Sequence, residues 1–344
     1  MGRIGYIDII KTIAIFLVLI THAHELAYIE SISIKSILYS FDRIGVPLFL
    51  MVSGILIIDK AKDKGLRVFK DKRLYQFIAI FIIYCILTNA VYYHFAKGHD
   101  WISSLMIAAK YNNLINYGRN EHAVHLWYMY LFITIYVLSP FIGKMTSSCS
   151  DKELLAFIII CLALNQASKS YDTLMQQGTL LNTLFKDFTG GCLVFFIFGY
   201  WYVRANKKET KHIINMTIAT FIFIAVITCK SLYEIKSRKL IWDLNWYTSS
   251  ITIALSGMAF FVILFELTKN SHPRKEITLI SSLSFGVYLT HYIIVLAVSL
   301  KFRNYLLQIE SYERIALLLF VSLLSFPLCY LMHKNKVTKW LIGC

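Results

Sequence analysis

Long runs of apolar residues, separated by short polar segments, repeat along the whole chain. A helix needs about 20 such residues to cross the hydrocarbon core of a bilayer. Ten runs reach or approach that length, at about 7–27, 41–58, 74–95, 124–142, 153–168, 190–204, 213–230, 247–268, 279–300 and 314–333. The pattern predicts an all-α fold, a polytopic transmembrane helical bundle of about ten spans, with an interfacial helix at about 100–111. Since the fifth and sixth runs are short, nine or eleven spans also fit.

Composition agrees with a membrane protein. The chain has 344 residues, of which 57% are hydrophobic and 16% are charged, and this is too apolar for a soluble domain of that size. The net charge of +15 does not indicate nucleic-acid binding, because the basic residues lie in the short segments between apolar runs. The seven cysteines have no paired spacing and mostly lie within apolar runs, so neither a disulfide framework nor a zinc site is expected, and we predict no metal.

Positive charge indicates the orientation, because cytoplasmic loops are enriched in Lys and Arg. The densest basic segment, 60–73, lies between the second and third runs, and with a cytoplasmic N-terminus it faces the cytoplasm. The opposite segments carry fewer such residues, apart from Lys230, Lys236, Arg238 and Lys239. We therefore expect an N-in, C-in topology, and one integral-membrane domain over 1–344 with no appended soluble domain. No signal-peptide cleavage site follows the first run, which we expect to be retained.

The first run contains a polar stripe: Asp8, Lys11, His22 and Glu25. Lys11 and His22 are eleven positions apart, so on a helix they lie within about 20° of one face and about 16 Å apart along the axis. An ionisable side chain at the bilayer centre costs about 2.5–3.5 kcal/mol, which favours a functional site over chance. The structural alternative is that Lys11 snorkels to the interface and His22 makes an interhelical hydrogen bond.

A histidine can accept the proton of a hydroxyl at neutral pH when a carboxylate or carbonyl orients its ring. The first candidate for that base is His22. Glu25, Asp42 and Glu121 are the acids that could orient it.

Two further positions could bind a ligand on the cytoplasmic side. Ser53 and Gly54 are small enough to let a ligand or a second helix approach, and tight helix packing is the favoured interpretation. Arg73 stands at the entrance of the third run, where a guanidinium suits phosphate oxygens, whereas the positive-inside signal accounts for most of its basic neighbours.

Two more histidines lie in or beside apolar runs. His125 enters the fourth run in the segment HLWY, and His291 lies in the middle of the ninth run, at the end of SFGVYLTH. A lone intramembrane histidine is as often a packing residue as a functional one. His125, His291 and His22 together make three such histidines, and this number favours a functional role.

At these residues the sequence resembles the acyltransferase-3 family of bacterial integral-membrane O-acyltransferases. The resemblance covers nearly the whole chain through short motifs in order: Asp8, Lys11 and His22, then FLMVSG at 49–54, Arg73, HLWY at 125–128, FGY at 198–200 and SFGVYLTH at 284–291. Within the family, the chain looks more like the short stand-alone members that modify surface polysaccharides, such as the enterobacterial common antigen O-acetyltransferase. It departs from the family pattern at Lys11 and Gln76, where arginine is usual, and lysine cannot make a bidentate phosphate contact.

The resemblance implies an acetyl-CoA-dependent O-acetyltransferase, a multi-pass protein of the bacterial cytoplasmic (inner) membrane. It implies transfer of an acyl group, usually acetyl, from cytoplasmic acyl-CoA to a hydroxyl of an envelope glycan or its lipid-linked precursor. Acyl-CoA is then a co-substrate and no cofactor is bound permanently. The implied site has His22 and Glu25 as catalytic residues, Lys11, Arg73, Ser53 and Gly54 around acyl-CoA, and His125, Trp127, Tyr288 and His291 supporting the acceptor or transition state. An acyl-enzyme and direct transfer both stay open.

The alternative function is a transporter or flippase for a polysaccharide precursor, because polar residues inside a bundle also mark translocation paths. The chain has no internal repeat and no matching pair of Gly- or Pro-broken runs, which disfavours that alternative. A glycosyltransferase is disfavoured because no paired metal-binding carboxylates are found.

Overall fold

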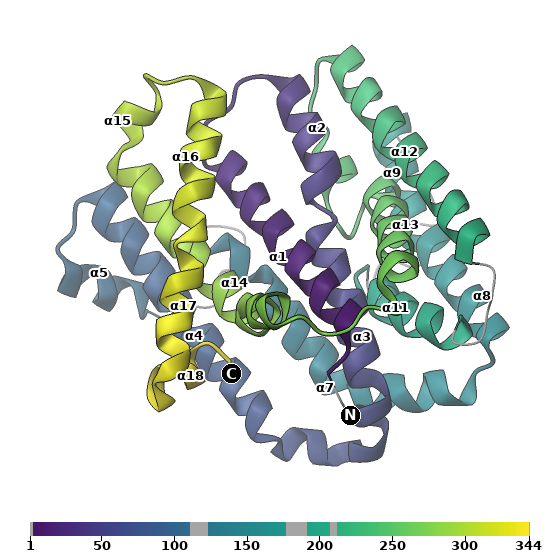
Figure 1. Ribbon diagram of the computed structural model, residues 1–344. Coiled ribbons are helices and arrows are strands. Elements are labelled where there is room, and N and C mark those ends of the chain that lie inside the picture. Colours follow the sequence, from purple (N-terminus) through teal and green to yellow (C-terminus); the bar gives the residue numbers. More distant parts are fainter. Residues whose placement is uncertain (1–2, 111–122, 177–190, 207–211, 344) are drawn as a thin grey trace. The chain divides into compact units, whose positions relative to one another are not determined.

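The computed structural model describes residues 3–110, 123–176, 191–206 and 212–343. Helices account for the regular structure of these residues, which include no strand (Figure 1). The α-helices are α1 (Gly5–Glu25), α2 (Ile32–Asp42), α3 (Gly45–Lys64), α4 (Lys72–Lys97), α5 (Trp101–Ala108), α7 (Trp127–Ser148), α8 (Asp151–Cys161), α9 (Ser168–Met175), α11 (Leu193–Ala205), α12 (His212–Ser237), α13 (Ile251–Thr268), α14 (Lys275–Lys301), α15 (Arg303–Leu306), α16 (Ser311–Leu323), α17 (Ser325–Lys334) and α18 (Lys336–Leu341). The prediction of an all-α bundle is confirmed.

The membrane spans follow the apolar runs of the sequence. Nine helical segments of the described residues are long and apolar enough to cross a bilayer, and α11 is a shorter apolar helix. Each of the ten predicted runs falls on one of these ten segments. The chain is therefore a multi-pass membrane protein. The short helix α5 lies where the interfacial helix was expected.

The fifth segment is longer than the sequence indicated. It runs over Asp151–Met175, because a π-helical turn, Leu162–Ala167, joins α8 to α9. The apolar pattern ends near Asn165 and Gln166, but both side chains are buried. Gln166 donates a hydrogen bond from its side-chain NH₂ to the carbonyl oxygen of Gly191, so this donor has a partner inside the protein that the run alone could not provide.

The chain divides into two compact units that alternate along the sequence. Unit 1 comprises Met1–Val18, Ser31–Val68 and Leu138–Thr278, and unit 2 comprises Leu19–Glu30, Phe69–Val137 and Leu279–Cys344. Helices α1, α7 and α14 each start in one unit and end in the other. The single domain over 1–344 stays a prediction.

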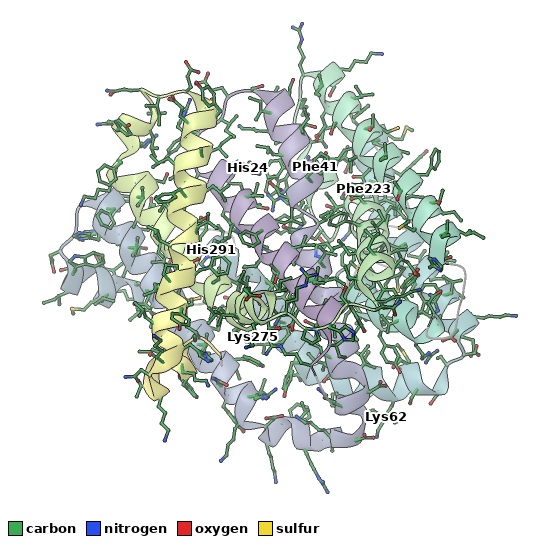
Figure 2. All side chains as sticks on the ribbon, viewed as in Figure 1. His24, Phe41, Lys62, Phe223, Lys275 and His291 are labelled. Atoms are coloured by element: carbon green, nitrogen blue, oxygen red, sulfur yellow. The ribbon has the colours of Figure 1, made fainter. Side chains whose placement is uncertain are left out.

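In unit 1, α3 and α11 approach closely at two glycines. A Cβ atom on Gly54 would overlap the carbonyl oxygen of Phe196, and one on Gly199 would overlap the carbonyl oxygen of Met51. Two backbones can come this near only where both helices carry small residues at the crossing. Elsewhere in unit 1, Phe41 of α2 and Phe223 of α12 bring their ring centroids to 6.1 Å (Figure 2).

Replacing Gly54 by Val is therefore expected to destabilise the protein. The added side chain meets backbone that cannot rotate away, so α3 and α11 must separate, at a cost of about 1–3 kcal/mol. The measurement is the thermal unfolding midpoint of the purified protein in detergent. The matched control is Ser53→Ala, since the Ser53 hydroxyl donates only to the carbonyl oxygen of Phe49 within its own helix. An unfolding midpoint of Gly54→Val equal to that of the control would contradict this packing role.

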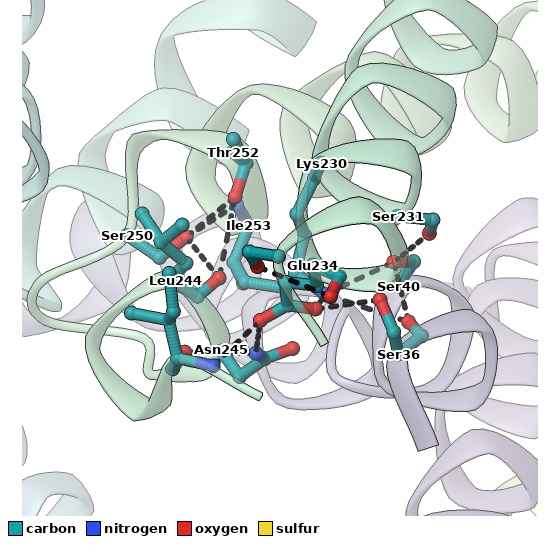
Figure 3. A network of polar contacts seen from close by, with 12 residues as sticks. Ser36, Ser40, Lys230, Ser231, Glu234, Leu244, Asn245, Ser250, Thr252 and Ile253 are labelled. Carbon is teal, nitrogen blue, oxygen red and sulfur yellow. Dashed lines mark hydrogen bonds and ion pairs between the residues drawn. The ribbon is translucent and has the colours of Figure 1, made fainter. Parts of the chain in front are cut away.

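A buried polar network joins α2, α12 and the loop after α12 within unit 1 (Figure 3). The ammonium of Lys230 lies 3.2 Å from the carboxylate of Glu234, one turn along α12, and the side chains are 1% and 0% exposed. Glu234 also accepts hydrogen bonds from the hydroxyl of Ser36, the side-chain amide of Asn245 and the backbone N–H of Ile241. Lys230 was assigned to an outer loop from the sequence, and the structure corrects this. It is a paired residue inside a helix.

Candidate functional site

The last turn of α1 carries a histidine–carboxylate pair. His22 Nδ1 lies 2.9 Å from Glu25 Oε2, and the two side chains are 11% and 21% exposed. A carboxylate oxygen only accepts hydrogen bonds, so Nδ1 carries the proton and donates it. This leaves Nε2 of the neutral ring with an unprotonated lone pair, which is the state a general base requires.

Two other histidines surround His22. Its ring centroid lies 5.3 Å from that of His291 on α14 and 6.4 Å from that of His125 in the short 3₁₀ helix Val124–Leu126, and the latter two are 6.0 Å apart. His125 is 1% exposed and His291, labelled in Figure 2, is 0% exposed. All three belong to unit 2, so the compact fold of that unit brings together residues from three distant parts of the chain. We call them the histidine cluster.

Aromatic residues fix the histidine cluster from one side. Tyr288 donates a hydrogen bond from its hydroxyl to the backbone carbonyl oxygen of His125, at 2.8 Å, and its ring packs on Tyr128. Tyr288 thus ties α14 to the start of α7. The half-buried Trp127 begins α7, and its ring lies edge-on to Tyr128.

Sequence reasoning missed Tyr292. Its ring stacks on His125 at 4.4 Å and meets His22 edge-on at 5.0 Å. The available signal was its position directly after His291, but an aromatic residue in an apolar run is usually part of the packing.

The turn that follows Glu25 is also held by residues that the sequence did not single out. Arg314 donates to the carbonyl oxygen of Tyr28 at 3.0 Å, and the Ser299 hydroxyl donates to that of Leu26 at 3.1 Å. Tyr28 has a φ of 50°, in the left-handed region that non-glycine residues rarely adopt. These contacts stabilise the end of α1, where the histidine–carboxylate pair stands.

The expected acyl-CoA residues divide between the two units. Lys11, Ser53 and Gly54 belong to unit 1, and Arg73 belongs to unit 2. Lys11 is half-buried on α1, and Arg73 is exposed at the start of α4, where its backbone N–H donates to the capping side chain of Asp71. Gly54 lies in the α3–α11 contact, which is the packing role that the sequence favoured.

Of the three acids that could orient His22, the structure pairs Glu25 with it. Asp42 belongs to unit 1 and Glu121 lies outside the described residues. Among the described residues there is no group of three or more His, Cys, Asp or Glu side chains that could hold a metal ion.

A family model described as an acyltransferase domain matches residues 4–334. The chain belongs to the acyltransferase-3 family. No curated protein and no solved structure matches it. In this membrane acyltransferase, a histidine is paired with a carboxylate, and such a pair is suited to deprotonating a hydroxyl during acyl transfer.

Proposed function

We propose that this acyltransferase moves an acyl group, in the simplest case acetyl, from cytoplasmic acyl-CoA to a hydroxyl of a cell-envelope polysaccharide or its lipid-linked precursor. It would do so in the bacterial cytoplasmic membrane. Family membership supports the reaction class. The single observation that carries the site is the 2.9 Å contact of His22 Nδ1 with Glu25, which leaves Nε2 available as a base.

In the proposed reaction, His22 Nε2 takes the proton of the acceptor hydroxyl as the oxygen attacks the thioester carbonyl carbon. The tetrahedral intermediate then collapses, the C–S bond breaks, and the CoA thiolate takes the proton from the His22 imidazolium. Glu25 stabilises that imidazolium and fixes the ring. Within the described residues no serine, threonine or cysteine side chain is hydrogen-bonded to His22, which favours direct transfer over an acyl-enzyme.

The position of His22 on α1 supports a donor that enters from the cytoplasm. Lys11 lies eleven residues earlier on the same helix, a rise of about 16 Å, which is of the order of an extended pantetheine arm. For the phosphates of CoA we propose Lys11 on α1 and, as a separate candidate that rests on the sequence, Arg73. Ser53 and Gly54 serve mainly the packing of α3. Trp127, Tyr288 and the other two histidines of the cluster would surround the acceptor.

The test is transfer of radiolabelled acetyl from acetyl-CoA to an envelope glycolipid extract by the purified protein in nanodiscs, with release of free CoA measured in parallel. We expect both signals to require the extract. Label in the glycan without added protein would show background chemistry. If no CoA is released with an extract known to contain acceptor hydroxyls, and acetyl-CoA does not bind, the transporter alternative replaces this proposal.

Glu25→Gln is expected to lower the transfer rate by about 100-fold or more while the protein stays folded. The amide cannot stabilise the imidazolium as a carboxylate does, and it can hold the ring in the wrong tautomer. The rate with saturating acetyl-CoA measures the effect. Glu30→Gln, an exposed acid five residues further on, is the matched control and should keep the wild-type rate. Equal rates in the two variants would exclude Glu25 as the orienting acid.

A further inference from the structure

We propose that His125 is the hydrogen-bond donor to the oxyanion of the acyl-transfer intermediate, and that His291, although equally buried, is not. This inference rests on the proposed function and assigns different roles to two residues that the sequence treats alike. It follows from which ring nitrogens of the histidine cluster are already engaged.

A neutral imidazole has one N–H and one lone pair, so a hydrogen bond at one nitrogen fixes the state of the other. His291 Nδ1 lies 2.9 Å from the carbonyl oxygen of Val287 and therefore donates to it. Its Nε2 is then an acceptor. The same reasoning makes Nε2 of His22 an acceptor, because Nδ1 donates to Glu25. Neither ring can offer a proton to an oxyanion while neutral.

His125 differs, because neither of its ring nitrogens has a hydrogen-bond partner among the described residues. The backbone of Leu289 lies close enough to interact with the ring, but without hydrogen-bond geometry. A buried polar group without a partner costs about 1–3 kcal/mol, and at a functional site this can be recovered when a ligand completes the bond. Among the ring nitrogens of the histidine cluster, the His125 N–H is thus the donor without a partner in the described part of the chain.

The ring of His125 is also held in place. Tyr292 stacks on it with an interplanar angle of 19°, and Tyr288 holds its backbone carbonyl oxygen. A preorganised donor in a site shielded from water stabilises a developing negative charge without rearranging, which is the requirement for an oxyanion hole. The proposed base and the proposed donor then stand on neighbouring rings, with centroids 6.4 Å apart.

The proposed step moves no further proton. As the hydroxyl oxygen attacks and His22 takes its proton, the thioester carbonyl oxygen becomes an oxyanion that accepts a hydrogen bond from His125. When the C–S bond breaks, the carbonyl re-forms as the new ester and the hydrogen bond weakens. His291 Nε2 accepts a hydrogen bond from a bound hydroxyl or amide and so contributes to binding.

The kinetic test compares His125→Leu, His125→Asn and His291→Leu. Loss of one oxyanion donor lowers kcat by about 100- to 1000-fold, and we expect this for His125→Leu with little change in the KM for acetyl-CoA. Because the asparagine side chain keeps an N–H donor, His125→Asn should recover at least about tenfold. His291→Leu should raise the KM for the acceptor more than it lowers kcat. A larger loss of kcat in His291→Leu than in His125→Leu would overturn the assignment.

A second measurement uses the wild-type protein and does not depend on enzymatic turnover. The wild-type protein with ¹⁵N-labelled histidine is studied by solid-state NMR in lipid, with and without an acetyl-CoA analogue in which CH₂ replaces the thioester sulfur. We expect His291 to be protonated at Nδ1 in both samples, and the His125 N–H signal to shift when the analogue binds. Binding without a shift at His125 refutes this inference alone. Failure of the analogue to bind refutes the proposed function instead.

Discussion

His22→Gln is expected to lower acetyl transfer by about 100- to 10,000-fold, the range attributed to a positioned general base. Glutamine is close to histidine in size and can still contact Glu25, but its amide cannot take up a proton. The side chain of His22 is 11% exposed and its ring is hydrogen-bonded to Glu25, a contact that the glutamine amide can keep. The unfolding midpoint is therefore expected to stay near the wild-type value.

The measurement is acceptor-dependent release of CoA at saturating acetyl-CoA, together with the affinity for acetyl-CoA. His99→Gln is the matched control, since His99 is an exposed histidine of the same unit. We expect the control to keep full activity and the His22 variant to bind acetyl-CoA normally. Full transfer activity in His22→Gln would mean that the base is elsewhere, and the proposed mechanism would fail even though the family assignment stands.

The spans could be predicted from the sequence because the bilayer imposes a length and a composition on every helix that crosses it. The ten apolar runs carry that constraint directly, and each corresponds to a helical segment. The prediction fell short where protein contacts replace lipid. The fifth segment continues through Gln166 because a carbonyl oxygen from another part of the chain receives its side chain.

Only part of the candidate site could be predicted from the sequence. An i, i+3 relation puts Glu25 beside His22 on any helix, so that pair follows from local geometry. The distances among His22, His125 and His291 do not, because no local rule relates residues more than 100 positions apart. Tyr292 and Arg314 were missed for a different reason, since their residue types are common in a packed core or at a helix end and stand out only by what they contact.

The sequence also misjudged Lys230, and its pairing with Glu234 predicts the largest effect on stability. Glu234→Leu removes the only carboxylate within 4.0 Å of Lys230 among the described residues. It also leaves the backbone N–H of Ile241 and the side-chain amide of Asn245 without this acceptor. Breaking one side of a buried ion pair costs about 3–5 kcal/mol, because the remaining charge stays buried without compensation. We expect a loss of this size in the free energy of unfolding.

Lys230→Met alone should also destabilise the protein, but less, because the hydroxyl of Ser36 and two N–H donors still satisfy the Glu234 carboxylate. The double variant Lys230→Met/Glu234→Gln removes both charges and keeps a carbonyl acceptor for Ile241 and Asn245. It should be more stable than Lys230→Met. The loss in the double variant should then be smaller than the sum of the two single losses, by a coupling energy of about 0.5–3 kcal/mol. The coupling is measured by denaturant unfolding in detergent of three variants: Lys230→Met, Glu234→Gln and the double variant. Strictly additive losses would mean that the two side chains are not paired in the folded protein, and that the loop after α12 is held by the other contacts of the network.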